Sequence, residues 1–393
     1  MASQSFNIPR TRILIVVLTT LLYFLSMNIS ISIVVRYSRE LGINISNTSI
    51  IWAVTFLISA IFRPISGHYG DKVSSFLMMS IGGMFLTLAN VVYMLSKDFT
   101  SLLLGRVLNG IASAMFIAPS IAAATLVVSE DLIGRSLSYR SAAVSFGALI
   151  GPVIGGYLVD YISYSVAFAL AAVLSALNAI VCALLYTRPD ITAQFQRESE
   201  KGSWKDAMNL TVILFTATSL IGGLSFFTFR SLLQSHYRDL GYPSSLYGIL
   251  MACFAAITMI LRLTSHRIIG SNLRRLFLIS ATCYFIVGLG SIVLSRTYMY
   301  PWAFIPVAFY GLGFGLLVPA VQSIISMSTM KNVRNRAMTV YAMGYDIGGF
   351  VGGIVLGHVA QTFGYSFSYA IIGLLLMINP ILVLMSTNRV LNK

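Results

Sequence analysis

Twelve apolar runs, each about 20 residues long, occupy most of this chain. A helix of about 20 residues rises about 30 Å, which matches the hydrocarbon thickness of a bilayer. Because a segment in lipid must satisfy its own backbone hydrogen bonds, the runs predict helices and not strands. We therefore predict an all-α integral membrane protein. The predicted spans are residues 13–35, 48–68, 76–95, 101–128, 137–159, 164–186, 209–235, 245–266, 275–295, 300–327, 337–360 and 365–386.

The last six runs repeat the first six at a nearly constant offset. Arg39-Glu40-Leu41-Gly42 recurs 199 residues later as Arg238-Asp239-Leu240-Gly241, and Tyr164 recurs 201 residues later as Tyr365. Two copies of a six-helix unit predict a pseudo-symmetric pair of bundles. Membrane carriers built from such repeats hold their solute at the interface of the two copies.

The two expected bundles leave little chain for anything else. We expect residues 1–187 and 209–393 to form them, with residues 188–208 as a cytoplasmic linker. The three cysteines lie inside spans without metal-ligand spacing, and no phosphate-binding loop occurs. Met1–Arg12 leads directly into the first run, so no cleavable signal peptide is expected. We expect no cofactor, no metal and no enzymatic activity.

The net charge of +14 follows from an uneven distribution of basic residues. With the N-terminus inside, 19 of the 26 Lys and Arg, Arg140 among them, lie in cytoplasmic segments or helix ends, and five lie outside. This is the positive-inside bias, which predicts both termini in the cytoplasm and a location in the cell membrane. The basic excess therefore indicates topology and not a nucleic-acid partner.

A motif between the second and third runs resembles the loop signature of the major facilitator superfamily, Gly-x-x-x-Asp-Arg/Lys-x-Gly-Arg/Lys. Gly67, Asp71 and Lys72 match it, whereas Ser74 and Ser75 replace the later glycine and basic residue. The resemblance implies a cytoplasmic gate, in which the carboxylate receives the N-terminal amides of a facing helix. The missing basic residue predicts a weaker latch.

Two further motifs extend the resemblance over essentially the whole chain. Arg106-Val107-Leu108-Asn109-Gly110 looks like the family's intramembrane arginine motif. Arg106 is either a functional group or a side chain that snorkels to the outer surface. The fifth span resembles the Gly-Pro-x-x-Gly-Gly motif of the antiporter branch, especially drug:proton exporters, and its small residues predict close helix packing. The matching residues are Gly147, Gly151, Pro152, Gly155 and Gly156.

Asp346 is alone among the twelve acidic residues in lying deep inside a predicted span. A carboxylate there can load and unload a proton, or it can anchor its helix through a permanent partner. Both interpretations stay open. Many exporters of the family carry an acid in the first span, where this chain has Asn28. Glu40 and Asp160, near outer helix ends, are expected to be solvated.

The remaining intramembrane charge indicates a class of solute. In this fold, spans one, four, seven and ten line the cavity. The resemblance therefore implies that Arg106, Arg230 and Gln322, which lie on these spans, face the cavity. Two arginines against one aspartate favour an anionic or zwitterionic solute, such as a carboxylate-bearing metabolite or siderophore. The aromatic run Phe226, Phe227 and Phe229 favours a broad range of amphiphilic drugs, unless these rings face lipid.

Together these features predict a secondary active transporter of the major facilitator fold. We expect it to export a small amphiphilic or carboxylate-bearing solute by proton-coupled alternating access, as a monomer in a lipid membrane. An organic-anion:proton symporter that imports its solute, or a lipid flippase of the same fold, remains an alternative.

Overall fold

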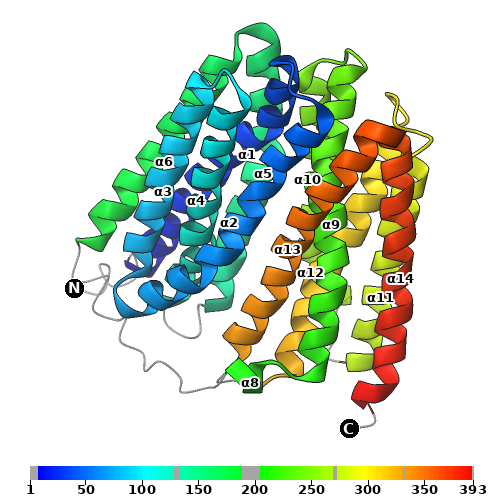
Figure 1. Ribbon diagram of the computed structural model, residues 1–393. Coiled ribbons are helices and arrows are strands. Elements are labelled where there is room, and N and C mark those ends of the chain that lie inside the picture. Colours follow the sequence, from blue (N-terminus) through cyan, green and yellow to red (C-terminus); the bar gives the residue numbers. More distant parts are fainter. Residues whose placement is uncertain (1–7, 128–132, 188–203, 269–271, 331–332, 392–393) are drawn as a thin grey trace. The chain divides into compact units, whose positions relative to one another are not determined.

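The computed structural model describes residues 8–127, 133–187, 204–268, 272–330 and 333–391, and the regular elements within them are helices. Figure 1 shows their arrangement and labels. The helices are α1 (Ile8–Glu40), α2 (Ile45–Lys72), α3 (Ser75–Leu95), α4 (Phe99–Leu126), α5 (Ile133–Tyr161), α6 (Tyr164–Tyr186), α8 (Trp204–Ala207), α9 (Leu210–Asp239), α10 (Ser244–Ile268), α11 (Leu273–Leu294), α12 (Phe304–Met327), α13 (Arg334–Phe363) and α14 (Tyr365–Leu391).

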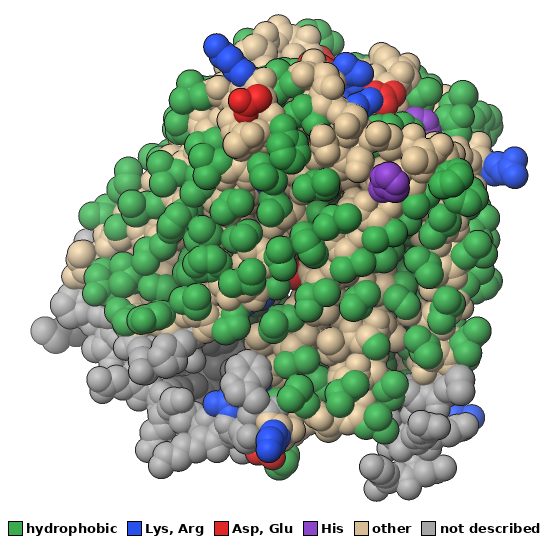
Figure 2. All heavy atoms as spheres, viewed as in Figure 1, with side chains coloured by type: hydrophobic (Ala, Val, Ile, Leu, Met, Phe, Trp, Pro, Cys, Tyr) green, Lys and Arg blue, Asp and Glu red, His purple; other side chains and the backbone are tan. Residues whose placement is uncertain are grey.

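Over the described residues, 12 helices are long and apolar enough to cross a membrane, which confirms the predicted number and type of spans. Hydrophobic side chains cover the flanks of these helices, and most of the visible charged side chains gather near the helix ends (Figure 2). The chain is therefore a multi-pass membrane protein. α2 continues to Lys72, so the predicted loop that contains Gly67 and Asp71 is helical up to that residue.

The chain divides into two compact units. Unit 1 comprises Met1–Ile43, Val54–Ser199 and Gly241–Ile249, and unit 2 comprises Asn44–Ala53, Glu200–Leu240 and Leu250–Lys393. α2 thus begins in unit 2 and α10 begins in unit 1, whereas the other long helices each lie in one unit. Of the linker expected at residues 188–208, residues 188–203 lie outside the described part.

The same hydrogen bond joins two helix ends within each unit, the end of α1 to the start of α6 and the end of α9 to the start of α14. In unit 1 the Tyr164 hydroxyl donates to Glu40 Oε1 at 2.8 Å, and in unit 2 the Tyr365 hydroxyl donates to Asp239 Oδ2 at 2.6 Å. These are the residues that the sequence repeat pairs. Glu40, expected to be free in solvent, is exposed but holds this contact.

A second repeated hydrogen bond lies inside each unit. Asn178 Nδ2 donates to the carbonyl of Thr19 at 2.6 Å in unit 1, and Asn379 Nδ2 donates to the carbonyl of Thr218 at 3.1 Å in unit 2. All four residues are buried. The repeat therefore extends from the sequence to individual polar contacts in the interior of each bundle.

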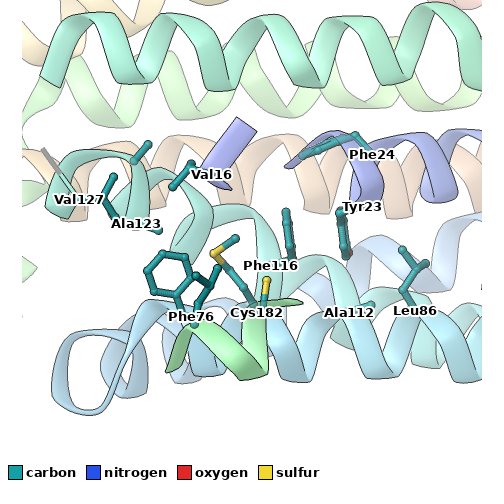
Figure 3. Close-up of a cluster of buried hydrophobic side chains, with 13 residues drawn as sticks. Val16, Tyr23, Phe24, Phe76, Leu86, Ala112, Phe116, Ala123, Val127 and Cys182 are labelled. Carbon is teal, nitrogen blue, oxygen red and sulfur yellow. The ribbon is translucent and has the colours of Figure 1, made fainter. Parts of the chain in front are cut away.

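The core of unit 1 is an apolar cluster contributed by α1, α3, α4 and α6 (Figure 3). The rings of Tyr23 and Phe116 stack in parallel with centroids 3.6 Å apart, and Phe24 meets Phe116 edge-on at 6.3 Å. Lipid tails are as apolar as these side chains, so close packing, and not exclusion of water, holds the helices together.

Side-chain caps define where α3 and α4 begin. Ser74, which stands where the family motif has glycine, accepts a hydrogen bond from the Phe76 amide at 3.2 Å and caps α3. Asp98 and Ser101 form a reciprocal capping box at the start of α4, with a 2.8 Å bond from the Ser101 amide. Hydrogen bonds from Ser101 lower the pKa of the Asp98 carboxyl.

Candidate substrate and coupling site

Asp346 lies in the middle of α13 and is 4% exposed. Across the described spans, every other acidic residue lies within one turn of a helix end. Gly344 and Gly348 flank Asp346, two residues before it and two residues after it, and bring the α13 backbone against Ser219 and Leu220 of α9. These close contacts hold the carboxylate at a fixed depth in unit 2.

Three tyrosines in unit 2, the buried Tyr284 and Tyr341 and the half-buried Tyr345, were not singled out by the sequence analysis. Tyr341 and Tyr345 lie one turn apart on α13 with ring centroids 5.5 Å apart, and Tyr284 of α11 lies, like Tyr345, within 4 Å of the Cβ position of Gly222. The Tyr345 hydroxyl lies next to Gly222 of α9. The i, i+4 spacing of Tyr341 and Tyr345 was the available signal, and it places polar oxygens in the same helix bundle as Asp346.

Arg106 is 1% exposed within α4, so its interpretation as a side chain that snorkels to the outer surface is wrong. Its backbone carbonyl accepts a hydrogen bond from Thr55 Oγ1 of α2 at 3.0 Å. The preceding residue, Gly105, packs against the ring of the fully buried Tyr93 of α3. Arg106 is therefore anchored between helices of unit 1.

Arg230 lies beside an aromatic cluster in unit 2. Its Cζ atom is 5.8 Å from the centroid of the Phe226 ring, within cation–π range. Phe226 meets Phe314 edge-on at 5.0 Å, and Phe229, 1% exposed, stacks on Tyr310 at 3.9 Å. Phe226 and Phe229 therefore pack against other rings of the same unit, and Phe229 does not face lipid.

The glycines of the fifth span form the contact between α5 and α1. A Cβ atom at Gly147 would lie 2.9 Å from backbone atoms of Phe24, and one at Gly151 would lie 2.7 Å from Asn28 Cβ. A Cβ at Gly155 would be equally close to α1. Asn28, 4% exposed, donates from Nδ2 to the Phe24 carbonyl at 2.7 Å, so it lies in this contact.

The C-terminal end of α5 caps the first turn of α10 within unit 1. Asp160 Oδ1 and Oδ2 accept hydrogen bonds from the amides of Ser244 and Ser245 at 2.8 and 2.7 Å. Gly156, one turn earlier on α5 and four residues after Pro152, leaves room for this approach, because a Cβ there would lie 2.7 Å from Ser245 Cα. Asp160 was expected to be merely solvated and is instead a helix cap.

The other predicted residues lie on α2 and α12. Gln322 is exposed on α12. Gly67, Asp71 and Lys72 lie in the last turns of α2, and their side chains fall outside the described part of the structure.

The structure brings the predicted residues together in two groups. Unit 1 holds Asn28 and Arg106, and unit 2 holds Arg230, Gln322 and Asp346. Unit 1 thus offers buried cationic and amide groups. Unit 2 offers an aromatic surface with a cation beside it and one buried carboxylate, a set suited to an amphiphilic solute and to proton exchange.

Comparisons with known proteins agree with this architecture. The family model described as Major Facilitator Superfamily matches residues 16–353. Multidrug resistance protein MdtG of Dickeya zeae (strain Ech586) is 24% identical over 375 residues, covering 91% of this chain and 90% of the relative. Multidrug resistance protein 1 of Bacillus subtilis (strain 168) is 27% identical over 355 residues, covering 88% of each. The quinolone resistance protein NorA of Staphylococcus aureus (strain MRSA252) is 26% identical over 140 residues, covering 35% of this chain and 36% of the relative.

Two solved structures share the fold. A POT family transporter in complex with a thioalcohol-conjugated peptide superposes with a TM-score of 0.75 at 12% identity, covering 96% of both chains. A mutant of the nucleoside transporter NupG superposes with a TM-score of 0.78 at 13% identity, covering 95% of this chain and 99% of the other.

Proposed function

Because the chain belongs to the Major Facilitator Superfamily of membrane transporters, we propose that it exports a small amphiphilic or carboxylate-bearing solute by proton-coupled alternating access. The direction of transport is supported by two relatives named for multidrug resistance that match over most of their length. The glycine face of α5 at Gly147, Gly151 and Gly155 packs against α1, as close helix packing in the antiporter branch would require.

The observation that carries the coupling proposal is the position of Asp346. It is buried in mid-span, whereas every other acid of the described spans lies near a helix end. A carboxylate in a low-dielectric site is favoured as the neutral acid, and access to water or to a cation favours the ionised form. Alternate exposure to the two sides of the membrane lets such a group take up a proton on one side and release it on the other.

Each unit by itself holds residues that we propose as solute contacts. In unit 2, Arg230 beside the Phe226 ring supplies a cation next to an apolar surface, and in unit 1 Arg106 supplies a buried cation. Asn28 and Gln322 are proposed as neutral polar contacts. An aromatic carboxylate meets these requirements, since its ring packs against phenylalanine while its charge faces a guanidinium.

In the proposed transport cycle, the solute site opens alternately to the two sides of a cell membrane. Gly67, Asp71 and Lys72 are proposed to close the cytoplasmic side. We propose that both chain termini lie in the cytoplasm, which the distribution of basic residues supports. Each chain contains both six-helix repeats, which supports a monomer as the functional form.

The proposal is tested by accumulation in inside-out membrane vesicles with an imposed pH gradient. The panel contains a quinolone, a cationic dye such as ethidium, and aliphatic carboxylates. Export predicts gradient-dependent accumulation in vesicles that contain the protein, with no accumulation in vesicles from cells that lack it. Accumulation only in right-side-out vesicles would instead establish an importer.

The same assay assigns the solute contacts. Arg106→Ala and Arg230→Ala are expected to reduce transport of the anionic members of the panel more than that of ethidium. Arg275→Ala, at an exposed position near the start of α11, is the matched control. Unchanged transport of the anions by both test variants would remove these arginines from the proposed site.

A further inference from the structure

Arg140 is a buried cation that the sequence analysis counted only as a topological charge. It lies in α5, within a membrane span, and is 8% exposed. It precedes Gly147 by seven residues, or two helical turns, so both Cβ positions project from the face of α5 that packs on α1. A guanidinium at such a position is costly unless something compensates its charge.

The hydrogen bonds of Arg140 with described residues all go to neutral groups. Its Nε and Nη2 atoms donate to Ser120 Oγ of α4 at 3.1 and 2.8 Å, and Nη2 also lies 3.4 Å from the Ile117 carbonyl. Ser120 donates its own hydroxyl hydrogen to the same carbonyl at 2.8 Å, so its acceptor side is directed at Arg140. Among the described residues, Nη1 has no hydrogen-bond partner.

The described spans of unit 1 place no carboxylate beside Arg140. The acids in its described spans are Glu40 and Asp160, at the outer helix ends, where they bind Tyr164 and the first turn of α10. Arg140 lies two turns into α5, near the other end of that helix. The described interior of unit 1 is therefore positively charged at Arg106 and Arg140 and is suited to an anion.

We propose that Arg140 and Ser120 form a binding site for the carboxylate of the transported solute. Ser120 fixes the Nε–Nη2 edge of the guanidinium, which leaves Nη1 to bind a carboxylate oxygen in the plane of the group. The described residues that contact Arg140 carry no negative charge, and the bound anion supplies it. The inference rests on the proposed function and names the residues of unit 1 that bind the carboxylate of the proposed aromatic solute.

The test is a binding titration on the full-length protein in detergent with dansylglycine, a fluorescent aromatic carboxylate, and with its methyl ester. Arg140→Gln is expected to weaken dansylglycine binding about tenfold or more, the size for loss of a charge-assisted contact. The ester, which lacks the charge, is expected to bind wild type and variant with dissociation constants within about twofold, as equal contacts give equal free energies. Arg140→Lys keeps the charge and is expected to lose less affinity for dansylglycine than Arg140→Gln. Arg275→Gln, exposed at the start of α11, is the control and is expected to bind like wild type.

Thermal unfolding separates a binding arginine from a structural one. Removing an uncompensated buried charge is expected to leave the melting temperature of the ligand-free protein unchanged or raised, and dansylglycine is expected to stabilise wild type but not Arg140→Gln. A lowered melting temperature of the ligand-free variant, or equal affinity of the acid for wild type and variant, would overturn the proposal. If Arg140→Gln cannot be purified, Ser120→Ala is measured in its place. This variant must weaken the binding of dansylglycine more than the binding of its methyl ester.

Failure of this inference is distinct from failure of the export proposal. Selective binding of the acid through Arg140, without gradient-driven movement of any solute in vesicles, would retain the anion site and refute proton-coupled export. Gradient-driven movement of the acid with equal rates in wild type and Arg140→Gln would retain export and refute the site.

Discussion

The contact between α1 and α5 gives a prediction whose sign can be worked out from the structure. In Gly151→Ala, the new methyl carbon would lie 2.7 Å from Asn28 Cβ and 3.1 Å from the Asn28 carbonyl carbon. Non-bonded carbons prefer separations of about 3.5–4.0 Å, so the helices must part by about 1 Å. Neither neighbouring atom is at the end of a flexible side chain, so local rotation cannot relieve the clash.

Two effects of this substitution oppose each other. Overpacking of this kind costs about 1–3 kcal/mol. Replacing glycine by alanine inside a helix returns about 1 kcal/mol of helix propensity. The net effect is a loss of about 1 kcal/mol in the free energy of unfolding. Gly151→Val, with a larger side chain, is expected to lose more.

Buried cysteines provide the assay for this prediction. Cys182 in unit 1 and Cys283 in unit 2 are 0% and 3% exposed, whereas Cys253 is only half-buried. In a Cys253→Ser and Cys283→Ser background, a maleimide dye reports the temperature at which Cys182 becomes accessible. Gly151→Ala is expected to lower that temperature. An unchanged or raised temperature would refute the steric reasoning, because helix propensity alone would then determine the outcome.

Other predictions concern contacts that the repeat and the caps define. Tyr164→Phe and Tyr365→Phe each remove one hydrogen bond, to Glu40 and to Asp239, and each is expected to lower thermal stability by about 0.5–1.5 kcal/mol; a loss for one variant only would show that the two contacts are not equivalent. Ser74→Ala removes the α3 cap and is expected to cost about 1 kcal/mol, whereas Ser74→Gly is expected to cost only a few tenths; equal losses measured by thermal unfolding would argue against capping.

Apolar length and repeated polar landmarks were enough to predict the fold. In lipid, each helix satisfies the hydrogen bonds of its own backbone, so the length of an apolar run is enough to predict a membrane-spanning helix. Landmarks at offsets of 199 and 201 identified pairs such as Tyr164 and Tyr365, whose side chains make matching hydrogen bonds. The glycine spacing of α5 also predicted a close contact, although it did not name α1 as the partner.

Contacts between distant parts of the chain could not be predicted in this way. Arg140 and Arg106 are both arginines within two turns of a helix end, and only the packed structure reveals that both are buried. Asp160 lies 84 residues before Ser244, and nothing in the local sequence indicates that it caps α10. In the corresponding contact of unit 2, the Ser46 amide donates to Gln361 Oε1 at 2.9 Å. Because glutamine is neutral, the two positions do not stand out in the sequence as a repeated pair of acidic residues.

The central claim is that Asp346 exchanges the proton that drives export. The most direct test is proton movement in proteoliposomes that contain a pH-sensitive dye inside, after addition of a solute that the vesicle screen identifies. Wild type is predicted to move protons on addition of the solute, as is Asp206→Asn, which alters an exposed acid of α8 in the same unit. Asp346→Asn is predicted to bind the solute without moving protons. Solute-dependent proton movement of wild-type size in Asp346→Asn would contradict the account and leave Asp346 with a structural role.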